Sequence, residues 1–248
     1  MPSNSPSSEK GNAARGWLLS GALMGFAAVL HAQAPAITPA PARPAPTLPT
    51  TLQPMMDYPM RDTAVCAAPD GMYYLTGTTG SPDWWAVTGD IQVWKSPDLK
   101  DWSAVVTHPR PRTVVWNVDR EGTWQKPVGL RNGAPFRPVW APEIQYLKNT
   151  FWLTYAIPGL GGGILKSSSG SAEGPYVSPL KPDQPLVANI DLMLFEDTDG
   201  KVYLAYGGGY VVQMKDDMTG LAEEPWQVQP TNAPRVGAEG AYLFKAWR

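Results

Sequence analysis

Three stretches of the chain carry the same pattern of apolar and polar positions: an apolar run, a two-residue turn signal and a second run rich in β-branched and aromatic residues. The stretches begin at Asp62, Trp140 and Asp191, and their turn signals, each eight residues later, are Asp70-Gly71, Lys148-Asn149 and Asp199-Gly200. Asp-Gly between such runs is among the strongest short-range hairpin signals. Each stretch therefore predicts a β-hairpin.

A third strand-like run follows each predicted hairpin, namely DIQVWKSPDLKDW, GGILKSSSGSAEGPY and YVVQMKDDMTGLAEE. The repeats start 78, 51 and 48 residues apart when Glu239 is counted as the fourth start. Since this part of the chain sustains no 3.6-residue periodicity, the pattern predicts an all-β fold. A repeat of about 50 residues with about four short strands is typical of a β-propeller blade. The longer first interval predicts an insertion at roughly 107–139 that forms a long loop near one face.

The predicted blade starts also carry the candidate chemistry. If they belong to the innermost strands, the four starts surround a central channel, and Asp62, Asp191 and Glu239 bring three carboxylates to it. Carboxylates crowded around an apolar channel oppose one another's ionisation, so such an arrangement indicates a functional site. The alternatives are a strand-entry cap for Asp62 and a surface turn for Glu239.

The N-terminal residues do not share the repeat. A basic lead precedes the uncharged, mostly apolar WLLSGALMGFAAVL (17–30) and the small residues of HAQA. Because fourteen residues fall short of the roughly 20 that span a bilayer, we expect a cleaved export signal at 1–34, with an uncleaved membrane anchor as the alternative. Residues 35–54 contain seven prolines and predict an extended linker. The folded domain is then 55–248, in a secreted or periplasmic protein.

Composition narrows the function classes. The 20 basic and 22 acidic residues give a net charge of −2 without a basic stripe, which excludes nucleic acid as an expected partner. The single cysteine, Cys66, excludes an internal disulfide and argues against a zinc site. The 11 Trp and 10 Tyr residues suit sheet cores as well as sugar-stacking clefts.

Four short segments, in order and at blade spacing, resemble glycoside hydrolase family 43. They are RDTAVCAAPDGMYYLTGT, WAPEIQYLKNTFWLTYA, IDLMLFEDTDGKVYLAYG and EGAYLFK, which together span about Arg61 to Lys245. The resemblance implies a five-bladed β-propeller of the arabinanase, β-xylosidase or α-L-arabinofuranosidase type. The chain would hold about three complete blades and the first strand of a fourth. It departs from the family pattern at Thr63 and Ala241, where members commonly have proline.

The same resemblance implies an inverting hydrolysis of O-glycosidic bonds, with pentose-type substrates. Inversion needs two carboxyl groups roughly 6.5–9.5 Å apart, with a water between one of them and the sugar. By position, Asp62 would be the general base and Glu239 the general acid, while Asp191 would orient Glu239 and favour its protonated form. The reaction would need no cofactor, and a structural calcium ion would belong to the complete fold.

Two further residues of the second blade are candidates for substrate contact. Trp140 is expected to stack on a sugar or to pack in the core, and Glu143 is expected to position substrate or to serve a structural role. The expected partner is therefore a carbohydrate. The competing hypothesis is a propeller that binds glycans without cleaving them, or an inactive truncated remnant of an enzyme.

Overall fold

The computed structural model describes residues 54–80, 88–105, 113–126, 130–131, 134–135, 138–233 and 239–245. The predicted signal segment, and the predicted linker except for its last residue, lie outside the described residues. Within the described ranges, no helix is long and apolar enough to cross a membrane.

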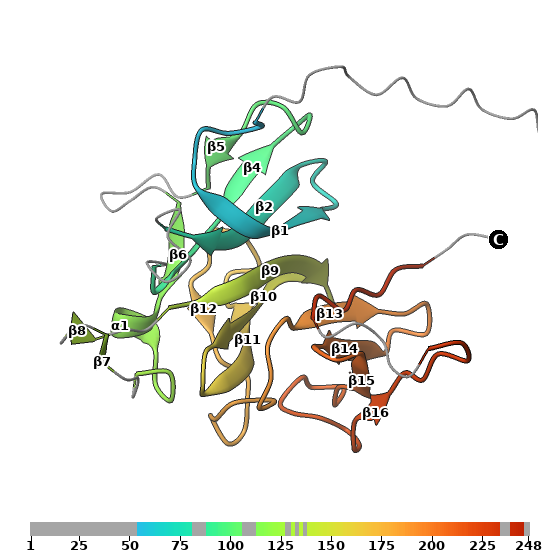
Figure 1. Ribbon diagram of the computed structural model, residues 1–248. Coiled ribbons are helices and arrows are strands. Elements are labelled where there is room, and N and C mark those ends of the chain that lie inside the picture. The colour runs from blue at the N-terminus through green and yellow to red at the C-terminus, as the bar shows by residue number, and fades with distance from the viewer. Residues whose placement is uncertain are drawn as a thin grey trace, which may run out of the picture. The chain divides into compact units, whose positions relative to one another are not determined.

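Three four-stranded antiparallel sheets form the predicted blades (Figure 1). Blade 1 contains β1 (Met60–Ala67), β2 (Tyr73–Thr79), β4 (Trp94–Ser96) and β5 (Ser103–Ala104). Blade 2 contains β9 (Trp140–Leu147), β10 (Thr150–Ile157), β11 (Gly161–Ser167) and β12 (Tyr176–Val177). Blade 3 contains β13 (Met193–Glu196), β14 (Val202–Tyr206), β15 (Tyr210–Gln213) and β16 (Trp226–Gln227). The first strands of neighbouring blades contact each other, β1 with β9 and β9 with β13, which confirms the propeller-type, all-β fold.

The three predicted hairpins are present, but their turns differ. β9 and β10 are joined by two residues with positive φ, Lys148 (47°) and Asn149 (58°). The other two hairpins close through longer loops, because Ala67 pairs with Tyr73 and Glu196 pairs with Val202. Counting back from the turn therefore does not reach equivalent positions in the three blades.

A backbone irregularity at the start of each first strand shows the true equivalence. β1 and β9 each contain a register shift there, and the residues with positive φ at these starts are Asp62 (52°), Ala141 (40°), Asp191 (58°) and Gly240 (68°). The predicted alignment of Trp140 with Asp62 and Asp191 is therefore wrong by one residue, because Ala141 is the residue of blade 2 with positive φ. The shorter turn of β9–β10 explains the error in blade 2. There the first strand ends at Leu147, directly before the turn pair, whereas in blade 1 it ends at Ala67, three residues before the pair.

The predicted insertion is more regular than a loop. β6 (Val114–Asn117) pairs with β3 (Asp90–Gln92), and α1 (Val118–Glu121) follows, with the Asn117 side chain accepting from the first backbone amides of its turn. β7 (Leu130–Arg131) and β8 (Ala134–Pro135) form a separate pair. The structure thus corrects the expectation of a long irregular loop for the described part of the insertion.

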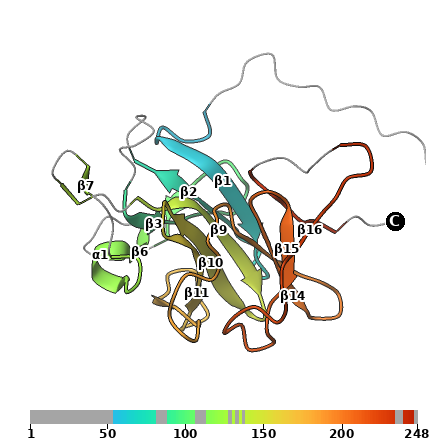
Figure 2. The same ribbon diagram turned by 60° about the horizontal axis from the view of Figure 1, so that its bottom comes forward.

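Figure 2 shows the strands of the three blades from a second direction. Aromatic and aliphatic side chains fill the spaces between these blades. Between blades 1 and 2, Tyr74 meets Phe151 edge-on at 4.7 Å between ring centroids, and Trp116 packs beside Tyr155. Between blades 2 and 3, the buried cluster includes Trp152. Burial of such side chains is the main favourable contribution to folding, and it fixes the blades against one another.

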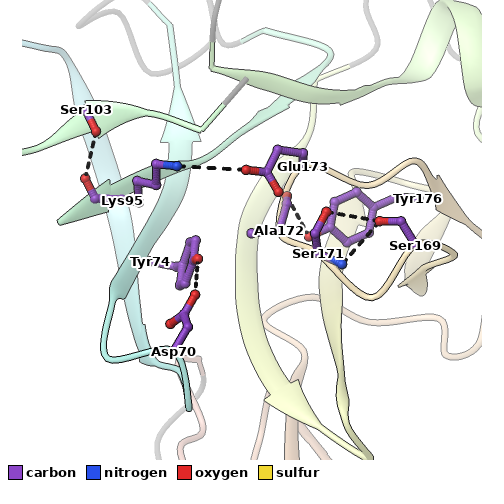
Figure 3. Close-up of polar contacts among 9 residues, drawn as sticks. All are labelled: Asp70, Tyr74, Lys95, Ser103, Ser169, Ser171, Ala172, Glu173 and Tyr176. Carbon is purple, nitrogen blue, oxygen red and sulfur yellow. Dashed lines mark hydrogen bonds and ion pairs between the residues drawn. The ribbon is translucent and has the colours of Figure 1, made fainter. Parts of the chain in front are cut away.

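At the turn end of β1 and β2, a cleft of about 490 Å³ lies between blades 1 and 2. Lys95 Nζ approaches Glu173 Oε1 at 3.9 Å, and Tyr74 donates its hydroxyl hydrogen to Asp70 Oδ2 at 2.7 Å (Figure 3). The Met72 amide donates to the other oxygen of Asp70 at 2.9 Å. Each charged side chain that lines this cleft thus has a partner.

Candidate active site

A cavity of about 310 Å³ lies at the other end of the blades, where the first strands begin. It is lined by Arg61, Asp62, Trp140, Ala141, Ile190, Asp191 and Glu239. These residues come in sequence from the four blade starts, and each is either the residue with positive φ or the one before it. The structure therefore brings together the three predicted carboxylates and Trp140, which are 177 residues apart along the chain at their extremes.

Asp62 enters the cavity from the bulge of β1. The side chain is 43% exposed, and its Oδ2 atom accepts hydrogen bonds from Arg61 Nε at 3.3 Å and from Thr78 Oγ1 at 2.7 Å. The bulge requires a close backbone approach, because a Cβ atom at Gly77 would lie 2.7 Å from the carbonyl oxygen of Arg61. Glycine at position 77 thus allows the conformation that presents Asp62.

Asp191 is half-buried and electrostatically linked to the other two carboxylates. Burial raises its pKa, and the negative charges of Glu239 and Asp62 raise it further, while the hydrogen bond from the Gly240 amide lowers it. That amide donates to Asp191 Oδ2 at 3.0 Å. The bond joins Asp191 to the residue that follows Glu239.

Glu239 is exposed and precedes a segment that runs beside blade 3. The Leu243 amide lies 3.0 Å from Met193 Sδ, and Lys245 Nζ forms an ion pair with Asp197 Oδ1 at 2.9 Å. Residues 241–245 form no regular strand, so the described part of the chain does not contain the predicted first strand of a fourth blade. These polar contacts, rather than the hydrogen bonds of a β-ladder, hold the segment beside blade 3.

Glu143 does not line the cavity that holds the three carboxylates. It lines a separate cavity of about 520 Å³ next to β1, β9 and β13, together with residues such as Cys66, Gln145 and Tyr242. Burial raises the pKa of Glu143 to about 7, and the charge of Asp191 also raises it, against a lowering hydrogen bond from Gln145. Gln145 Nε2 donates this bond at 2.7 Å. Glu143, which is predicted to position substrate or to serve a structural role, thus lines a different cavity from the three carboxylates.

The described residues do not form a site for the calcium ion that the resemblance implies. Among them, no group of three or more His, Cys, Asp and Glu side chains is placed to hold a metal ion. Calcium prefers six to eight oxygen ligands, several of them carboxylates. The calcium ion of the complete fold therefore stays a prediction.

The sequence does not predict four residues of the site, namely Arg61, Ala141, Ile190 and Thr78. Arg61 and Ile190 line the cavity, and each precedes an aspartate with positive φ, so their place in the chain could have indicated this. Thr78 contacts Asp62 from the neighbouring strand. Its position opposite Arg61 depends on the strand register, which the turn length does not specify when a bulge intervenes.

A comparison with protein families identifies the class of this fold and site. The model of the glycosyl hydrolases family 43 matches residues 51–246, which is most of the chain. The chain belongs to glycosyl hydrolases family 43.

Curated relatives carry the names of several glycosidases. A β-D-galactofuranosidase, xynD, of Aspergillus niger is 29% identical over 166 residues, which cover 62% of this chain and 45% of the relative. A β-xylosidase of Bacillus subtilis is 29% identical over 207 residues, which cover 74% of this chain and 35% of the relative. The chain thus spans less than half the length of these relatives.

Solved structures share the fold. An α-L-arabinofuranosidase from Clostridium thermocellum superposes with a TM-score of 0.55 at 24% identity, covering 74% of this chain and 60% of that one. An endo-arabinase from Bacteroides thetaiotaomicron gives a TM-score of 0.50 at 18% identity, covering 68% and 56%. At these identities the likeness is one of fold.

Proposed function

We propose that this chain hydrolyses O-glycosidic bonds with inversion at the anomeric carbon. The observation that carries the proposal is the single cavity in which Asp62, Asp191 and Glu239 converge from three blade starts. Family membership and the glycosidase names of the relatives agree with this chemistry. Secretion or periplasmic location remains part of the proposal, as does the export signal on which it depends.

In the proposed reaction, Asp62 is the general base and Glu239 is the general acid. The Asp62 carboxylate removes a proton from a water molecule as the water oxygen bonds to the anomeric carbon. Glu239 gives its proton to the glycosidic oxygen as the bond between that oxygen and the anomeric carbon breaks. Asp191 acts on Glu239 through its negative charge, and the Gly240 hydrogen bond sets their relative position.

Sugars with a neutral, furanose or pentose-type ring are the proposed substrates. The relatives are named for xylose, arabinose and galactofuranose substrates, and the cavity of about 310 Å³ suits one or two sugar units. Trp140 provides an aromatic wall of the cavity against which a sugar ring can stack. Glu143 is not proposed to contact substrate, because it lines the neighbouring cavity.

A glycan-binding role without cleavage is the second candidate. One observation favours it: Glu239 is exposed, and its segment is held by a few polar contacts without a β-ladder. A general acid needs a fixed position to protonate the leaving oxygen at a useful rate. A cavity with a mobile acid would still bind a sugar.

Assays on glycosides with different leaving groups distinguish hydrolysis from glycan binding without cleavage. We expect the full chain to hydrolyse 4-nitrophenyl β-D-xylopyranoside, α-L-arabinofuranoside or β-D-galactofuranoside, and proton NMR to show first a product of inverted anomeric configuration. Glu239→Gln should lower kcat on unactivated oligosaccharides by about 10²–10⁴-fold. It should lower kcat far less on 2,4-dinitrophenyl glycosides, whose leaving group needs no proton. Saturable binding of xylo- or arabino-oligosaccharides without turnover of any substrate would support the binding role instead.

A further inference from the structure

Thr78 lies next to the proposed base without lining the cavity itself. It is 3% exposed on β2 and pairs with Arg61, the residue before Asp62. The matching position in blade 2 is Ala156, which pairs with Trp140, and in blade 3 it is Gly207, whose amide donates to the carbonyl of Ile190. Of these three equivalent positions, the one in blade 1 carries a hydroxyl group.

Two hydrogen bonds fix the direction of that hydroxyl. The Ala141 amide donates to Thr78 Oγ1 at 2.7 Å, and Thr78 Oγ1 lies 2.7 Å from Asp62 Oδ2. An amide nitrogen can only donate, and a threonine hydroxyl has a single hydrogen. The hydroxyl hydrogen must therefore point to the Asp62 carboxylate. Since the hydroxyl also accepts a bond, it is polarised in the sense that strengthens its donation.

The same hydroxyl joins the bulges of two blades. Asp62 and Ala141 both have positive φ, a conformation that is costly for non-glycine residues unless the surroundings hold it. Thr78 is bonded to the side chain of the first and to the backbone of the second. Any rotation of blade 1 against blade 2 at this end would break one of the two bonds, which ties the position of Asp62 to both blades.

We propose that Thr78 is a positioning residue for Asp62, an inference that rests on the proposed function. Together with Arg61, it holds Oδ2 of the carboxylate. Oδ1 receives no hydrogen bond from the residues that the structure describes, so this oxygen is left to accept the proton of the attacking water. Thr78 acts on the reaction through Asp62, and the sugar does not touch it.

Thr78→Val tests the proposal, because valine keeps the shape and removes the hydroxyl. We expect kcat to fall about 10–100-fold, the cost of a loosely oriented catalytic group. KM should stay within about twofold, since substrate contacts are unchanged. Thr78→Ser should restore kcat to within about threefold of wild type, because the serine hydroxyl makes the same two bonds.

Thr76→Val is the matched control for lost stability. Thr76 is a fully buried threonine on the same strand, and its hydroxyl donates to the backbone carbonyl of Gln92 at 2.7 Å, away from any carboxylate. Thr76→Val should lower the melting temperature as Thr78→Val does, but it should leave kcat unchanged. Assays on all variants should be run well below their melting temperatures, with circular dichroism as a check of folding.

Full kcat in Thr78→Val, or an equal loss in Thr76→Val and Thr78→Val, would overturn this inference while leaving the proposed function in place. Loss of kcat in Thr78→Val without rescue by Thr78→Ser would also overturn it, since a packing effect would then explain the loss. A wild-type chain without turnover of any of the three 4-nitrophenyl glycosides would overturn the proposed function and this inference with it.

Discussion

The two ends of blades 1 and 2 use carboxylates in different ways. At the turn end, Asp70 receives one donor on each carboxylate oxygen, and Glu173 approaches Lys95 (Figure 3). At the end where the strands begin, both bonds to Asp62 fall on Oδ2, and the Gly240 amide binds Oδ2 of Asp191. A hydrogen bond to a carboxylate therefore does not by itself mark a functional group. A general base needs a carboxylate that is fixed through one oxygen and can accept a proton at the other, beside a cavity that admits substrate.

Charge balance separates the same two ends. The cleft at the turn end pairs opposite charges across the blades, as Lys95 and Glu173 show. The cavity at the other end is lined by three carboxylates and one cation, Arg61. Burial and like charge together raise the pKa of Asp191 there. Such a cluster opposes its own ionisation, and groups of this kind gather at functional sites.

The largest expected effect comes from exchanging one aspartate at each end. Asp62→Asn should lower kcat by about 10²–10⁴-fold, because the amide cannot accept the proton of the attacking water. Asp70→Asn should leave kcat unchanged and lower the free energy of unfolding by about 1 kcal/mol, because an amide group cannot accept on both sides. Turnover measurements and urea unfolding on both variants check this pair.

Equal losses of kcat in Asp62→Asn and Asp70→Asn would remove the distinction between the two ends. A fall in kcat that tracks the loss of stability in both variants would mean that the two aspartates serve the fold alone.

Glu143→Gln should have the next largest effect, on the pH dependence of stability. The pKa of Glu143 is raised by burial to about 7, so the folded state binds the proton more tightly than the unfolded chain does. Wild type should then be most stable below the ordinary carboxyl pKa and lose stability as pH rises to about 7. The rise in the pKa of Glu143 corresponds to a loss of folding stability on the order of 3–4 kcal/mol at most, which Glu143→Gln should recover at pH 8 and not at pH 4.

The control for this prediction is an exposed carboxylate at the turn end. Glu173→Gln should change the free energy of unfolding little at either pH, because the Glu173 side chain is 44% exposed. Urea unfolding of wild type and both variants at pH 4, 6 and 8 measures the effect. A Glu143→Gln variant with the pH dependence of wild type would show that another group is responsible.

The sequence predicts the elements better than it predicts their alignment. Turn chemistry is local, so the hairpins around Asp70-Gly71, Lys148-Asn149 and Asp199-Gly200 and the approximate blade spacing could be read from the chain. The bulges and the lengths of the hairpin loops could not be read from it, and both change the count from the turn to the start of the strand. For that reason the count from the turn reaches Trp140, one residue before the equivalent Ala141.

The sequence could not predict the side-chain contacts around the carboxylates, for a different reason. Thr78 bonds to partners 16 and 63 residues away, and neither bond leaves a signal in local periodicity. Glu143 follows Pro142 in a segment that resembles the family motif, yet strand alternation and the bulge direct it to the neighbouring cavity. The convergence of the three carboxylates was predicted because it depends on the repeat, whereas the support around them depends on the register.

Tyr74→Phe offers a smaller test of the turn end. The change removes the hydroxyl that donates to Asp70 Oδ2, while the buried ring keeps its contact with Phe151. We expect the free energy of unfolding to fall by about 1 kcal/mol, since Asp70 is exposed and water can replace the lost donor. Urea unfolding gives the value, and kcat should not change. A loss of kcat would mean that the turn end influences the carboxylates at the opposite end of the blades.

The ion pair between Lys95 and Glu173 should have the smallest effect. Its atoms are 3.9 Å apart, and the two side chains are 35% and 44% exposed, so water and salt screen their attraction. A double-mutant cycle with Lys95→Met and Glu173→Gln should give a coupling free energy below about 0.5 kcal/mol, which declines further in 0.5 M NaCl. A coupling above about 2 kcal/mol would mean that this pair orders the interface of blades 1 and 2. Charge pairing at the turn end would then be structural to the same degree as the Thr78 bonds at the other end.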